Sequence, residues 1–221
     1  MTQPETEIRA AWRHIAGNHH DGYIDDVLVR YAEPHRHYHT ATHIMFVLRH
    51  LHDVARASGV PLSSEVTAGA VYHDAIYDAR ADDNEAHSAD LAVADLTAVG
   101  WSPDRCRLVA TLINATAGHL SDTWHTADDS PDVADVTDTA MLLDADLAIL
   151  GSDPGAYQAY VNGVRTEYSH VDDAQWRIGR GGVLQRFCQR RRLFITEFMH
   201  TTYEHRARAN IEAELAALRI E

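Results

Sequence analysis

The chain has 221 residues and 45% hydrophobic content, so it can form one large domain or two small ones around an ordinary core. Its formal net charge of −14 disfavours binding to the phosphate backbone of a nucleic-acid polymer. The 19 basic residues are all arginine, which excludes a lysine Schiff base and the lysine of a standard phosphate-binding P-loop.

The cysteines and the first residues bear on the cellular setting. Cys106 and Cys188 are the only cysteines and form no CxxC pair, so we expect a reduced environment. Residues 1–17 carry charges throughout and contain no apolar signal core. No segment approaches the roughly 20 apolar residues needed to span a membrane. We therefore expect a cytoplasmic protein with no membrane partner.

The hydrophobic pattern predicts helices along nearly the whole chain. In residues 40–58, apolar side chains recur with a 3.6-residue period, and Gly59 and Pro61 end the helix. Gly181-Gly182 is expected to bend or break a late helix. No alternating strand, repeat or linker is found, so the expected fold is all-α, with a single domain over 1–221. The expected helices are 5–16, 22–32, 40–58, 64–77, 84–98, 102–116, 134–150, 154–170, 174–198 and 203–219, with a polar loop over 119–132.

An adjacent histidine and aspartate, His73 and Asp74, lie in an apolar stretch downstream of His43. A carboxylate on a mostly apolar helix is costly to bury unless it is paired with a basic group or a metal. The alternatives are an arginine partner for Asp74 and a packed, singly hydrogen-bonded histidine at His43. Taken together, the three residues predict a site for a divalent cation.

A further histidine, His39, forms an H-x-x-x-H spacing with His43 and is an alternate ligand. Thr40 stands where the glutamate base of a zincin peptidase would follow the first histidine, so that class is disfavoured. The neighbouring His35 and His37 could equally be an adventitious metal-binding surface.

Two aspartates, Asp144 and Asp146, lie in a second apolar helix and also need a partner. Two positions correspond to about 200° around a helix, so only one of them is expected to reach an ion. The other could cap the helix or pair with Arg165.

The order His43, His73-Asp74 and a distal aspartate resembles the H…HD…D signature of the HD-domain metal-dependent phosphohydrolases. Residues 145–147 look like the Ala-Asp-x-Leu element of that family, which favours Asp146 over Asp144 as the fourth ligand. The segments RHYHTATHI, YHDAIYDARADDNEAHSA, INATAGH and LLDADLAILG are similar to an uncharacterised bacterial subfamily of predicted phosphohydrolases. The resemblance covers about residues 30–170. It implies a single HD-like helical bundle with the C-terminal helices packed on that core.

The resemblance also bears on catalytic groups. Related hydrolases often carry an acidic residue after the HD pair, which favours Glu85 or Asp83 as general base. The alternative is that Asp82-x-x-Glu85 forms a capping box at the start of a helix. His119 could protonate a leaving group, or it could be an ordinary loop residue.

The implied reaction is hydrolysis of a small phosphate ester, such as a nucleotide, by metal-activated water, with Asp74 both ligand and catalytic residue. Mixed nitrogen and oxygen ligands suit one Mn²⁺, Fe²⁺, Co²⁺, Ni²⁺ or Zn²⁺ better than Mg²⁺. Arg36 and Arg80 are the candidates for binding substrate phosphate, with Arg165 a further one. The alternatives are a non-catalytic metal-dependent ligand-binding or sensor protein of the same fold, and a helical interaction protein without a metal. The sequence leaves open whether the chain forms a homodimer.

Overall fold

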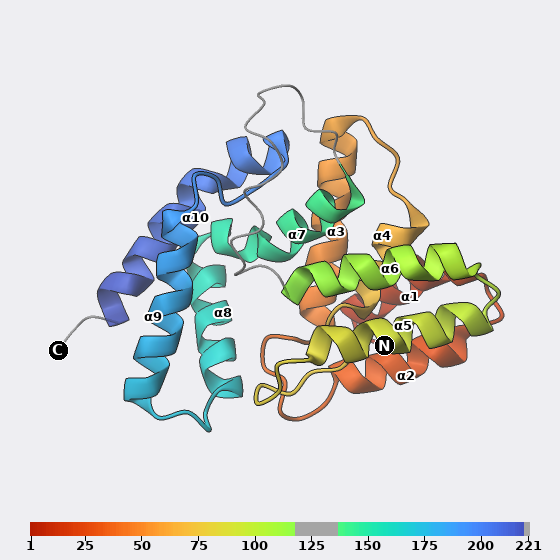
Figure 1. Cartoon of the computed structure of the whole chain (residues 1–221), viewed down its shortest axis with the longest axis horizontal. Helices are drawn as coiled ribbons and strands as arrows, with labels where there is room; N and C mark the ends of the chain where they lie inside the picture. The colour runs from red at the N-terminus through yellow and green to blue at the C-terminus, as the bar shows by residue number, and fades with distance from the viewer. Residues whose placement is uncertain (118–136, 219–221) are drawn as a thin grey trace.

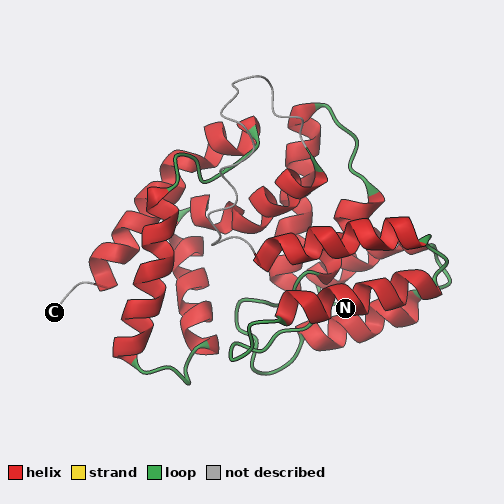
Figure 2. Cartoon of the chain, viewed as in Figure 1, coloured by secondary structure: helices red, strands yellow, loops and turns green. Residues whose placement is uncertain are grey.

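The computed structural model describes residues 1–117 and 137–218, and these form helices joined by loops (Figure 1). No strand occurs among the described residues, which confirms the all-α prediction (Figure 2). The first part of the chain contains α1 (Gln3–Ala16), α2 (Asp21–Tyr31), α3 (Ala41–Ser58), α4 (Ser64–Tyr72), α5 (Asn84–Ala98) and α6 (Pro103–Thr116). The second contains α7 (Asp138–Leu147), the 3₁₀ turn η3 (Ala148–Gly151), α8 (Pro154–Glu167), α9 (Asp173–Gln189) and α10 (Glu197–Leu218).

Helix α3 is central to the packing, because it contacts α1, α4, α7 and α10. Its buried face is the apolar stripe expected from the sequence, and Val47, Leu51 and Val54 on it are fully buried. In Figure 1 the helices α8, α9 and α10 lie together on one side, and α7 lies between them and the earlier helices. Helix α10 packs on η3 and α9. The fold therefore brings residues from α3, α4 and α7 close together.

Helix α4 is shorter than the predicted 64–77, and it ends at Tyr72 with His73 as its C-cap. Beyond it, backbone groups find partners outside the helix. The Ile76 N–H donates to Ser88 Oγ, and the Asp74 carbonyl accepts from Arg36 Nη1. Because these hydrogen bonds satisfy the backbone, the helix can end here. The hydrophobic period of the sequence does not indicate them. The HD pair thus lies at a helix end followed by a loop.

The expected break at Gly181-Gly182 is wrong, since α9 continues through both glycines to Gln189. The chain turns instead over residues 190–196, and α10 begins at Glu197 rather than at 203. Two buried carboxylates hold this turn: Glu204 accepts from the backbone N–H of Leu193, and Asp144 accepts from that of Thr196.

Candidate metal centre

Four side chains from α3, from the end of α4 and from α7 converge at one point. His43 Nε2 lies 3.2 Å from His73 Nε2 and 3.1 Å from Asp146 Oδ1. Asp74 Oδ2 lies 3.3 Å from the Nε2 of His43 and 3.2 Å from that of His73. The distance between His73 Nε2 and Asp146 Oδ1 is 3.5 Å. The structure therefore brings together the four residues that the sequence nominated as first-choice ligands.

These separations match the spacing of ligands around one ion. Atoms about 2.1 Å from a metal lie roughly 3.0 Å apart at right angles and roughly 3.4 Å apart at the tetrahedral angle. His43, His73 and Asp146 accordingly form a group that could hold a metal ion. Asp74 adds a second carboxylate beside them.

Hydrogen bonding fixes which nitrogen of His73 faces the group. His73 Nδ1 lies 3.0 Å from the carbonyl oxygen of Ala70, which can only accept, so Nδ1 carries the proton. Nε2 is then the nitrogen that faces the carboxylates and that could bind a metal. The imidazoles of His43 and His73 are 2% and 1% exposed, whereas the carboxylates of Asp74 and Asp146 are each 16% exposed. Solvent therefore reaches the centre from the carboxylate side.

The charges of the four side chains are strongly interdependent. Burial lowers the pKa of His43, but Asp146 and Asp74 outweigh it and raise that pKa, and the same carboxylates raise the pKa of His73 well above its usual value. Burial raises the pKa of Asp74, but His73, His39 and His43 together hold it well below its usual range. Two partly buried carboxylates thus need positive charge, which protons on the imidazoles or a cation can supply.

Arg36 positions the HD pair and does not face the solvent. Its side chain is 0% exposed, and its Nε donates to Glu33. Nη1 donates to the carbonyls of Asp74 and His39, and Nη2 donates to that of Ala75. The prediction that Arg36 binds substrate phosphate is therefore wrong, because all three guanidinium nitrogens are committed to the protein.

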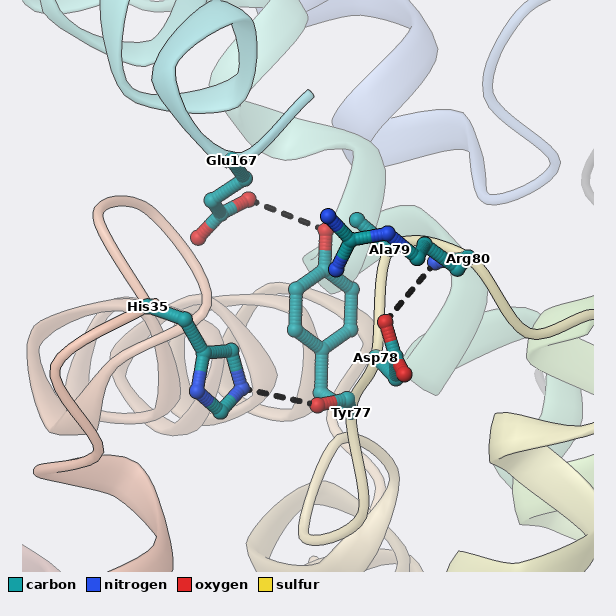
Figure 3. A pocket seen from close by; sticks show the side chains of 6 residues that line it. All are labelled: His35, Tyr77, Asp78, Ala79, Arg80 and Glu167. Carbon is teal, nitrogen blue, oxygen red and sulfur yellow. Dashed lines mark hydrogen bonds between the residues drawn. The ribbon is translucent and has the colours of Figure 1, made fainter. Parts of the chain in front are cut away.

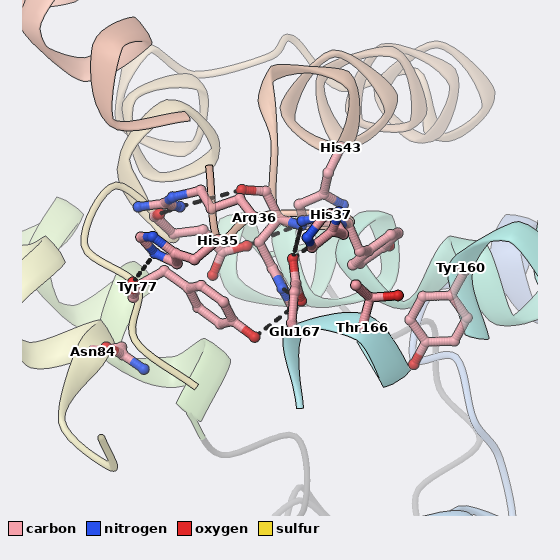
Figure 4. Close-up of polar contacts among 12 residues, drawn as sticks. His35, Arg36, His37, His43, Tyr77, Asn84, Tyr160, Thr166 and Glu167 are labelled. Carbon is pink, nitrogen blue, oxygen red and sulfur yellow. Dashed lines mark hydrogen bonds and ion pairs between the residues drawn. The ribbon is translucent and has the colours of Figure 1, made fainter. Parts of the chain in front are cut away.

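A carboxylate that the sequence did not single out, Glu167 at the end of α8, organises the histidine-rich segment before α3 (Figure 4). Its Oε1 accepts from the backbone N–H groups of His37, Tyr38 and His39 at 2.7, 2.8 and 3.0 Å. Its Oε2 pairs with His39 Nδ1 at 2.7 Å and accepts from the Tyr77 hydroxyl at 3.0 Å. Burial raises the pKa of Glu167, but His39 and the backbone donors outweigh it and lower that pKa to about 2.

His39, the alternate ligand, lies beside the centre without joining the converging group. Its Nδ1 is held by Glu167, and its ring centroid is 5.9 Å from that of His43. The charge of His39 nevertheless reaches the centre, because it helps to lower the pKa of Asp74. With Nδ1 engaged, Nε2 is the nitrogen of His39 that remains for chemistry.

Asp144, the other alternate ligand, faces away from the centre and holds the connection between α9 and α10. Its carboxylate accepts from the backbone N–H groups of Ile195 and Thr196 at 2.8 and 2.7 Å and from the Thr196 hydroxyl at 2.7 Å. Burial nevertheless raises its pKa to about 6. The suggested pairing with Arg165 is wrong for both aspartates: Asp144 has these partners, Asp146 faces the centre, and Arg165 pairs with Asp173.

Asp83 and Glu85, the residues after the HD pair that were predicted as candidates for the general base, lie at the start of α5. Helix α5 has Asp83 as its N-cap with no side-chain cap hydrogen bond, so the alternative of a capping box from Asp82 is wrong. Glu85 is half-buried in the first turn of α5, and its charge contributes to raising the pKa of Tyr168. His119 lies outside the described residues. The catalytic roles of Glu85 and His119 stay predictions.

A pocket of about 260 Å³ lies beside the segment held by Glu167 (Figure 3). The backbone N–H of Arg80 donates to Asp78 Oδ1 at 2.9 Å, whereas its guanidinium forms no ion pair within the described ranges. His35 points its Nε2 at the Tyr77 carbonyl, 2.9 Å away, so it is not directed at the metal centre. The pocket is lined by His35, Tyr77, Asp78, Ala79, Arg80 and Glu167.

The fold and the centre define the class of this molecule as an all-helical protein with a candidate metal-ion site. Comparison with known proteins adds no relative: no family model, no curated protein and no solved structure matches the chain. No helix among the residues described is both long and apolar enough to cross a membrane.

Proposed function

We propose that the protein is a metal-dependent phosphohydrolase of the HD type, which cleaves a small phosphate ester with metal-activated water. The observation that carries this proposal is the convergence of His43, His73, Asp74 and Asp146, in the chain order of the H…HD…D signature, with separations of 3.1–3.5 Å. A divalent cation held by these four residues would supply positive charge that lowers the pKa of a water molecule and offsets charge on the phosphate. That charge would also attract an anionic substrate to a protein with a net charge of −14.

The protein's own contribution to proton transfer is proposed to come from His39. Its Nδ1 is fixed by Glu167, an arrangement that selects one tautomer and orients the ring. Its side chain is 21% exposed and lies against the ring of His43. In this proposal His39 Nε2 exchanges a proton with the leaving group or with the attacking water.

The pocket beside His39 is proposed to receive the part of the substrate that is not cleaved off as phosphate. It shares Glu167 and Tyr77 with the His39 group, so the two regions adjoin. The Arg80 guanidinium at the pocket is an available cation for an anionic or polar substituent.

The test uses full-length protein without a histidine tag. Elemental analysis after growth in metal-replete medium is expected to find about one divalent cation per chain. The loaded protein is then screened against a panel of phosphate esters, with chelator-treated protein as the control. Metal binding without turnover of any ester would favour the sensor alternative, and a stoichiometry near zero would remove the metal centre altogether.

Metal loading is expected to raise the melting temperature more at high pH than at low pH. The pKa values of His43 and His73 are raised, so in metal-free protein the stabilising protons are fully present below about 6.5 and are lost as the pH rises through the raised values. Above that pH range only a bound cation offsets the negative charge of the two carboxylates. Differential scanning calorimetry of loaded and chelated protein between about pH 6 and pH 9 checks this. A temperature difference independent of pH would contradict it.

Replacing Glu167 with glutamine is expected to lower kcat by about 10- to 100-fold while metal content stays near the wild-type value. The glutamine oxygen can still accept from the backbone N–H groups of residues 37–39, but its NH₂ group cannot accept from His39 Nδ1. The loss should be larger for esters with basic leaving groups, because these need protonation most.

Steady-state kinetics on two esters that differ in leaving-group pKa measures this effect. Glu212→Gln on the exposed side of α10 is the matched control. An equal loss on both esters would argue against proton donation by His39 to the leaving group.

A further inference from the structure

The hydroxyl of Tyr38 is buried and has no hydrogen-bond partner among the described residues. A buried donor without a partner is costly, and most such groups in folded proteins are satisfied. Where one persists next to a functional site, a ligand that completes the hydrogen bond is a natural explanation. Tyr38 belongs to the segment that leads into α3, directly before His39.

Several contacts hold Tyr38 in one position. Its ring centroid lies 4.8 Å from that of His43, 5.0 Å from that of His39 and 4.7 Å from that of Tyr160. Its backbone N–H donates to Glu167 Oε1 at 2.8 Å. Helix α8 approaches closely, since a Cβ at Gly163 would lie only 3.1 Å from the Tyr38 Cβ. The phenol is therefore packed on all these sides, and its orientation is set before any ligand arrives.

The Tyr38 ring packs against His43, one of the four residues of the metal centre, with 4.8 Å between the ring centroids. Burial raises the pKa of Tyr38 well above its usual value, and the carboxylates of Asp146 and Asp74 act in the same direction. The group consequently stays a neutral O–H, which is a hydrogen-bond donor, throughout the physiological range. A neutral donor beside a cation complements an oxyanion, because it adds attraction without a further charge to be desolvated.

We propose that the Tyr38 hydroxyl donates a hydrogen bond to a non-bridging oxygen of a phosphate group held at the metal centre. The inference rests on the proposed function for the nature of the ligand. It adds a residue that neither the sequence pattern nor the ligand geometry identified. Tyr38 would touch the substrate directly, and its contribution requires no change in its protonation.

The test measures binding of inorganic phosphate to the metal-loaded, full-length protein by titration calorimetry. Tyr38→Phe removes only the oxygen atom and should weaken phosphate binding by about tenfold to a hundredfold, the range for a hydrogen bond to a charged group. Metal content should stay at its wild-type value and the melting temperature should be equal to or higher than that of the wild type, because the hydroxyl has no protein partner to lose and its burial without one is costly. Tyr23→Phe, on α2 against Trp12, is the matched control and should bind phosphate as the wild type does.

Equal phosphate affinity in wild type and Tyr38→Phe would overturn the proposal, as would the absence of phosphate binding to loaded wild type. Loss of metal from Tyr38→Phe would also overturn it, and would instead indicate that the hydroxyl orients His43, whose Nδ1 is likewise buried without a partner. Failure of the proposed function is a separate result. In that case the loaded protein binds phosphate through Tyr38 but hydrolyses none of the esters in the panel.

Discussion

Substitution of Asp74 by alanine is expected to abolish metal-dependent hydrolysis, with a loss on the order of 10³-fold or more. Asp74 Oδ2 lies within 3.3 Å of both imidazoles, so its removal takes away one ligand and half of the negative charge at the centre. The fold should survive, because the groups that fix this loop are backbone carbonyls. Arg36 bonds to the carbonyl of Asp74 and not to its carboxylate, and alanine keeps that carbonyl.

Circular dichroism, metal analysis and kinetics on one verified ester together measure these effects. Asp90→Ala, at an exposed position on α5, is the matched control and should be fully active. Wild-type turnover by Asp74→Ala would mean that the HD pair is not the reaction centre, whatever else binds there.

The sequence predicted the all-helical fold and the group at the centre for the same reason. Both depend on patterns along one chain: a 3.6-residue period for the helices, and the ordered motif around His43, His73 and Asp146 for the site. The α3 stripe is buried as its period requires. The local pattern is reliable for α3 because this helix has 18 residues and its apolar face is buried along its length.

The features that the sequence did not predict depend on contacts between distant segments. Glu167 bonds to His37 across 130 positions of sequence, and nothing around Glu167 distinguishes it from an ordinary helix-end glutamate. From the sequence, Arg36 was predicted to bind phosphate. In the structure its guanidinium is buried and donates to the backbone carbonyl of Ala75, next to the HD pair. The end of α4 was not predicted either, because the backbone beyond it finds partners outside the helix, such as Ser88 for Ile76.

The two aspartates of α7 point in different directions from the helix and have different partners. Asp146 directs its Oδ1 at His43 Nε2, 3.1 Å away, whereas Asp144 directs both oxygens at residues 195–196. The angular argument from the sequence anticipated that only one of them would face the ion. It did not anticipate the partner of Asp144, which is the backbone of the turn before α10.

Asp146→Asn is therefore expected to lose most of its bound metal. Its metal affinity should fall by more than the roughly 10- to 100-fold that is typical when a hydrogen-bond partner of a ligand is removed. Asp144→Asn should bind metal nearly as tightly as the wild type but be less stable by about 1–3 kcal/mol, since an amide cannot accept from every donor that the carboxylate serves. Matched metal titrations and urea denaturation of the two variants separate the effects. If Asp144→Asn empties the centre while Asp146→Asn binds normally, the ligand assignment on α7 is reversed, and the orientation of that helix must differ from the one described.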